Sequence, residues 1–127
     1  MQKIFNSKLI LLVFVIIIAI RTQITIAQPI PPLKVLIDCS DEPDTQEWSE
    51  RIATFLKVQY PFLVAMLDSE GYKPEEVIRL IIKRDISAAG SVRNFLFMSS
   101  KIFKEYPDDM GVTESIAVHE LGHILQE

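Results

Sequence analysis

The chain of 127 residues contains two histidines, and both belong to one motif near its C-terminal end, His119-Glu120-Leu121-Gly122-His123. Residues four apart lie on the same face of an α-helix, one turn above the other. In a helix, therefore, both imidazole rings can reach one metal ion, with Glu120 beside them as a base. The motif requires a helix in this part of the chain and predicts a zinc site on it.

The residues around the motif are compatible with such a helix. Residues 113–126 contain no proline, and Thr113 is a suitable N-cap. At about 100° per residue, His119, Glu120 and His123 fall on one side of the helix and an apolar set falls on the other. The apolar set is Ala117, Val118, Leu121, Ile124 and Leu125. Gly122 lowers helix propensity by about 1 kcal/mol relative to alanine, so either a neighbouring group approaches the backbone there or the glycine is simply tolerated.

Residues 1–27 have the pattern of a secretory signal peptide. Lys3 and Lys8 make the N-terminal region basic, and an unbroken apolar run follows at residues 9–20. Thr25 and Ala27 are small residues that form a candidate cleavage site. A transmembrane helix needs ~20 apolar residues, whereas Arg21 ends this run early. We expect cleavage near Ala27 and a secreted or periplasmic protein of residues 28–127 with no membrane attachment. An uncleaved membrane anchor is the alternative.

The composition of residues 28–127 limits the partners of this domain. All 17 acidic residues lie there, whereas three of the 13 basic residues precede it, so this part is more acidic than the net charge of −4 for the whole chain. An acidic domain offers no basic stripe to phosphates, which argues against a nucleic-acid partner. Cys39 is the single cysteine of the sequence, so we expect a buried thiol and no disulfide within the chain.

The hydrophobic pattern predicts both strands and helices in one domain. Strands are expected over residues 33–38, 77–83 and 94–100, with 77–83 central in a sheet. A long amphipathic helix should begin at Asp44, which forms a capping-box pattern with Glu47, and should kink at Pro61. Residues 87–91 read as a loop and residues 100–106 as a helical turn. The expected fold is an α+β domain in which a small mixed sheet packs with this long N-terminal helix and the C-terminal motif helix.

The sequence resembles the plant basic secretory protein family and its bacterial relatives, which are secreted zinc metallopeptidases of the gluzincin type. The resemblance covers nearly all of residues 28–127 and is most specific at the histidine motif with Gln126, where a metzincin has glycine. The other matching segments are 44–48, 60–61, 69–72 with Pro74, the strand from Val77, 88–89, 99–100 and 106–111. The resemblance implies a zincin-like domain in which His119 and His123 bind Zn²⁺ and Glu120 is the catalytic base.

The resemblance also implies a third zinc ligand beyond residue 127. In the family, a segment similar to Glu-Gly-Ile-Ala-Asp follows, and its glutamate is the implied ligand, whereas this sequence stops at Glu127. Glu127 shares the helix face of the histidines but lies about 6 Å beyond His123 along the helix axis, too far to complete a tetrahedral site easily. We therefore expect a truncated domain, the N-terminal part of the family's fold, with weak zinc binding and little or no peptidase activity.

The function expected from these features is zinc-dependent hydrolysis of peptide bonds in a peptide or protein substrate. By analogy with zincins, an extended substrate should pair with an edge strand, for which residues 94–99 are the candidate. Asp108 and Asp109 either orient a histidine or belong to the turn before the helix. Two alternatives compete with the peptidase: a non-catalytic secreted binding module with a zincin-like shell, and an anchored envelope protein in which the motif is incidental.

Overall fold

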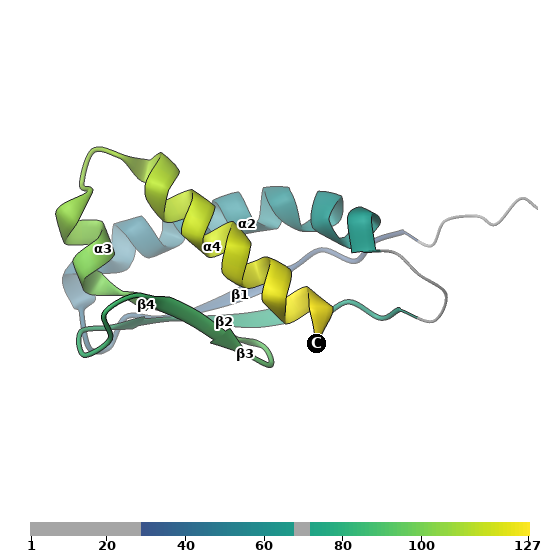
Figure 1. Ribbon diagram of the computed structural model, residues 1–127, viewed down its shortest axis with the longest axis horizontal. Helices are drawn as coiled ribbons and strands as arrows, with labels where there is room; N and C mark the ends of the chain where they lie inside the picture. The colour runs from purple at the N-terminus through teal and green to yellow at the C-terminus, as the bar shows by residue number, and fades with distance from the viewer. Residues whose placement is uncertain (1–28, 68–71) are drawn as a thin grey trace, which may run out of the picture.

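The computed structural model describes residues 29–67 and 72–127, so the predicted signal peptide lies outside the described residues. The elements in chain order are β1 (Lys34–Asp38), the 3-10 turn η1 (Pro43–Thr45), α2 (Gln46–Leu67), β2 (Val77–Lys83), β3 (Ala89–Val92), β4 (Phe95–Ser99), α3 (Ser100–Glu105) and α4 (Met110–Gln126). The strands form one sheet, and α2 and α4 cover the same face of it (Figure 1). This arrangement confirms an α+β fold with a small mixed sheet. No helix within the described ranges is long and apolar enough to cross a membrane.

The order of the strands across the sheet is β1-β2-β4-β3. β2 pairs in parallel with both β1 and β4, whereas β3 is antiparallel to β4. The prediction of a central strand at residues 77–83 is confirmed, because β2 has neighbours on both sides and buries Ile78, Leu80 and Ile82. These side chains alternate along the strand, as expected for a strand with one face against the core.

The edge strand β3 was not predicted from the sequence. Residues 87–91 read as a loop because they are rich in serine, alanine and glycine, but four residues from Ala89 onward pair with β4. The two strands are joined by a tight turn at Arg93 and Asn94, and Arg93 adopts a left-handed conformation with φ of 52°. Pairing with a hydrophobic neighbour strand therefore outweighs weak local strand propensity here.

Helix α2 begins later than the sequence indicated. Asp44 lies inside η1 and α2 starts at Gln46, so the predicted N-cap at Asp44 was wrong. The Asp44 carboxylate is instead 3.6 Å from Lys104 Nζ. The helix continues through Pro61 as one element to Leu67.

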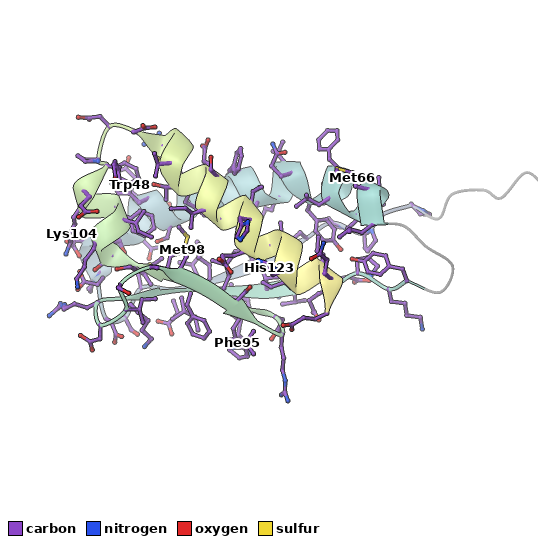
Figure 2. The ribbon with its side chains drawn as sticks, in the orientation of Figure 1. Trp48, Met66, Phe95, Met98, Lys104 and His123 are labelled. Carbon is purple, nitrogen blue, oxygen red and sulfur yellow. The ribbon has the colours of Figure 1, made fainter. Side chains whose placement is uncertain are left out.

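The hydrophobic core lies between the sheet and the two long helices. Met98 of β4 points into it from the sheet (Figure 2). Other fully buried members are Ile52, Leu56, Tyr60, Ile78, Leu80, Leu96 and Leu121. Cys39 is buried at the edge of this core and its thiol donates to Ser49 Oγ at 3.1 Å, which confirms the expected buried cysteine.

A buried carboxylate ties three parts of the fold together. Glu42 precedes η1 and is 1% exposed, and its side chain accepts hydrogen bonds from Lys104 Nζ of α3, at 2.6 Å, and from Arg84 Nε after β2. These two donors, Lys104 first, lower the pKa of Glu42 from 4.5 to about 2. Lys104 is labelled at the end of the molecule farthest from the C-terminus of α4 (Figure 2). The cluster therefore stabilises the fold away from the histidine motif.

Candidate metal centre

Helix α4, which carries the histidine motif, begins at Met110 rather than at Thr113. Asp109 occupies the N-cap position, although its side chain makes no capping hydrogen bond. Thr113 is fully buried inside the helix, and its hydroxyl has no hydrogen-bond partner among the described residues. The predicted cap at Thr113 was therefore wrong, because the chain already turns into the helix after Tyr106, whose carbonyl accepts from Asp109 N–H at 3.3 Å.

The predicted division of α4 into a packed face and an exposed face is confirmed. Ala117, Leu121, Ile124 and Leu125 are buried against the sheet and α2. His119 and His123 are exposed on the opposite face, and Glu120 is half-buried between the two faces. Figure 2 labels His123 on α4 where the helix passes the edge strand β3. The helix is thus held by its apolar side while the motif histidines remain open to solvent.

The two histidine rings converge on one point. Their Nε2 atoms are 3.0 Å apart, the ring centroids are 4.6 Å apart, and the ring planes are nearly perpendicular at 88°. Two imidazole nitrogens that bind one tetrahedral zinc ion at ~2.0–2.1 Å lie about 3.3 Å from each other. A shift of a few tenths of an ångström would therefore give the spacing of a zinc-ligand pair, so the two rings fit the metal that the motif implies.

None of the three acidic residues considered from the sequence, Glu127, Asp108 and Asp109, completes a metal site with the histidines. Within residues 29–67 and 72–127 no group of three His, Cys, Asp or Glu side chains is arranged to hold a metal ion. Glu127 Oε2 accepts a hydrogen bond from the backbone N–H of Arg93 at 2.7 Å, which holds this carboxylate at the β3–β4 turn. Asp109 lies ten residues before His119, roughly 15 Å along the helix, so Asp108 and Asp109 belong to the turn and do not orient a histidine.

Glu120 contacts the edge strand. The hydroxyl of Ser91, on β3, donates to Glu120 Oε2 at 2.8 Å. Sequence reasoning missed this residue because residues 87–91 read as a loop. The segment before the Arg93-Asn94 turn is short and rich in small residues, so the sequence carries no clear strand signal for it.

A groove opens beside His119 and Glu120. Its volume is about 490 Å³, and most of its lining is apolar. The lining residues are Ser87, Ala88, Ala89, Ile102, Ser115, Ile116, His119 and Glu120. The groove therefore connects the start of the edge strand with the reactive face of α4, and it has room for an uncharged side chain of a ligand.

The edge strands of the sheet are β1 and β3, and the prediction of residues 94–99 for an edge position was wrong. β4 (Phe95–Ser99) pairs with β2 on one side and β3 on the other, so its backbone groups are already in use. β3 pairs with β4 alone among the described strands, and it packs beside α4. Of these two edges, the edge of β3 is the one beside Glu120, because Ser91 of β3 contacts this residue of α4.

The glycine at position 122 is simply tolerated in helix α4, and no neighbouring group lies close to its backbone among the described residues. A Cβ atom placed on Gly122 would meet no atom within 4 Å in the part of the chain that the structure describes. The alternative of a neighbouring group against the helix backbone is thus not supported by the described residues.

Comparisons of this chain with protein-family models, with curated proteins and with solved structures found no match.

Proposed function

We propose that the protein is a secreted zinc-dependent peptidase built on a zincin-like domain. The observation that carries this proposal is the convergence of His119 Nε2 and His123 Nε2 to 3.0 Å on the exposed face of α4. At this distance one neutral imidazole can donate a hydrogen bond to the other, and replacement of the shared proton by a zinc ion needs only a small increase in the distance between the two nitrogens. The resemblance to the basic secretory protein family, which rests on the same residues, supports the same function.

In this proposal each motif residue has a separate role. His119 and His123 would hold Zn²⁺ through their imidazole nitrogens, and the metal would supply Lewis-acid activation of the scissile carbonyl and of a water molecule. Glu120 accepts a proton from the attacking water through its carboxylate and passes it to the leaving amine. This role is supported by the position of Glu120, which is half-buried and adjacent in sequence to the exposed His119.

The substrate in this proposal is an extended peptide that pairs with the outer edge of β3. Main-chain hydrogen bonds to an edge strand supply affinity, and neighbouring pockets select side chains. The groove beside His119 and Glu120 begins at Ala88 and Ala89, at the start of β3, so a peptide on this edge would place a side chain in it. Its apolar lining favours an uncharged side chain.

A non-catalytic secreted binding module is the second candidate. It is favoured by one observation, the absence of a third ligand side chain near the histidines within the described residues. Two imidazoles and solvent make a weaker zinc site than three protein ligands. Under both candidates we propose that the protein is exported, that it has no nucleic-acid partner and that its domain consists of residues 28–127.

Zinc titration against a competing chelator, followed by hydrolysis of an unfolded protein, tests the proposal. We expect the present chain to bind zinc weakly through its histidines and to show little or no turnover. Tight stoichiometric binding with clear turnover would show that a ligand within the chain has been overlooked. Extension of the chain by the family's Glu-Gly-Ile-Ala-Asp-like segment should raise both zinc affinity and activity.

Substitutions in the extended chain separate the two candidates. His119→Ala or His123→Ala should lose zinc and activity together, because each removes a ligand. Glu120→Gln should keep zinc while the rate falls by ~10²–10⁴-fold, the usual contribution of a general base. Glu114→Gln, the same change six residues earlier on α4, is the matched control and should keep both. Full activity of Glu120→Gln, or zinc retained by both histidine variants, would refute the peptidase and favour the binding module.

A further inference from the structure

The edge strand presents one polar side chain to the motif helix. Side chains of β3 alternate between the two faces of the sheet. Ser91 is registered with Leu96, which is fully buried under the helices, whereas Val92 is registered with Phe95 and is 51% exposed. Ala89 packs against the core on the same side as Ser91. Ser91 is therefore the residue through which β3 makes a polar contact with α4.

The contact is a hydrogen bond to a charged acceptor. Ser91 Oγ lies 2.8 Å from Glu120 Oε2 in a partly buried position. Hydrogen bonds to carboxylates are stronger than neutral ones and restrict the orientation of the carboxylate more tightly. The bond engages one carboxylate oxygen and leaves the other able to accept a proton.

Strand formation alone does not account for serine at this position. Edge strands favour threonine, valine and other β-branched or aromatic residues, whereas serine contributes little to strand propensity. A small hydroxyl-bearing side chain does fit between the strand and Glu120, where a larger apolar residue would leave the carboxylate without its donor. The chemistry of the residue thus matches the group that it faces.

We propose that Ser91 is a positioning residue that holds the carboxylate of Glu120 in the orientation needed for proton transfer. This inference rests on the proposed function, because it assigns to Ser91 a role that acts through the general base. The same strand would bind the peptide and orient the base, so the relative position of substrate and carboxylate would be set by β3 alone. Ser91 itself would not contact the reacting atoms.

Steady-state kinetics of the extended chain, in which turnover is expected, test the positioning role in the presence of excess Zn²⁺. Ser91→Ala should lower kcat by about 10- to 100-fold, the range typical of residues that orient a catalytic group, with zinc content and KM unchanged. Ser91→Thr keeps the hydroxyl and suits a strand, so it should restore most of kcat. Ser40→Ala is the control for removal of a serine hydroxyl outside the site, because the hydrogen bond of Ser40 to the Asp38 carboxylate comes from its backbone N–H, at 3.0 Å, and is kept in the variant. Unchanged kcat in Ser91→Ala, or no rescue by threonine, would overturn the proposal.

A second measurement does not depend on turnover. Urea unfolding of the wild type, Ser91→Ala, Glu120→Ala and the double variant gives the coupling between the two residues. Ser91→Ala should lower the free energy of unfolding only when Glu120 is present. An equal loss in the wild-type and Glu120→Ala backgrounds would overturn the proposal. Coupling between the two residues, together with no hydrolysis by any variant of the extended chain, would instead refute the peptidase function while leaving the contact between Ser91 and Glu120 in place. The two failures are therefore distinguishable.

Discussion

Substitution of Leu121, the residue at the centre of the histidine motif, tests whether the site depends on the packing of α4. Leu121 is 0% exposed and faces the core, while the histidines on either side of it face solvent. Leu121→Ala removes three carbon atoms, which corresponds to about 2.4 kcal/mol at about 0.8 kcal/mol per buried methylene. Incomplete collapse of the cavity brings the expected loss to ~3–5 kcal/mol. This is a large part of the ~5–15 kcal/mol that stabilises a typical domain.

The assay is urea unfolding followed by circular dichroism, with Met66→Ala as the control. Met66 lies on α2 and is 80% exposed, so its truncation should change the free energy of unfolding by no more than about 0.5 kcal/mol. Figure 2 shows Met66 near the end of α2. At temperatures where Leu121→Ala remains folded, its zinc affinity should equal that of the wild type. A loss of stability below about 1 kcal/mol, or an equal loss in the control, would refute the assignment of the packed face.

The remaining predictions concern charge, the metal site and export. The free energy of unfolding should fall as the pH is lowered from 4.5 to about 2, because the unfolded chain takes up a proton at Glu42 before the folded chain does, and Glu42→Gln should remove this part of the pH dependence in urea titrations. Glu127→Ala should leave zinc affinity unchanged in chelator competition, because its carboxylate is bound to Arg93 N–H, and a weaker affinity would make it a ligand. Intact-mass analysis of the exported protein should show removal of residues 1–27, whereas a mass that retains them in a membrane fraction would favour an anchor.

The hydrophobic pattern of the sequence was sufficient to predict the elements in which apolar residues recur at a regular interval. Strand β2 has the bounds that its alternating apolar residues predicted, and the two faces of α4 follow from the 3.6-residue period. The convergence of the histidines also follows from their spacing, because a helix places residues four apart on one face. Boundaries were less well determined. Helix α4 begins three residues before the predicted cap, since a suitable residue type at Thr113 does not require the chain to start its helix there.

The sequence by itself determined that a helix would carry two converging imidazoles and a carboxylate, because helical spacing is a local property of the backbone. Only the tertiary structure decided which strand lies at the edge of the sheet and which residue meets Glu120. Strand order depends on pairing between segments far apart in the chain, so the strongly apolar β4 became an inner strand and the weak segment at Ala89–Val92 became the edge. The contact of Ser91 with Glu120 joins residues 29 apart in the sequence, and it exists because the sheet places β3 beside α4.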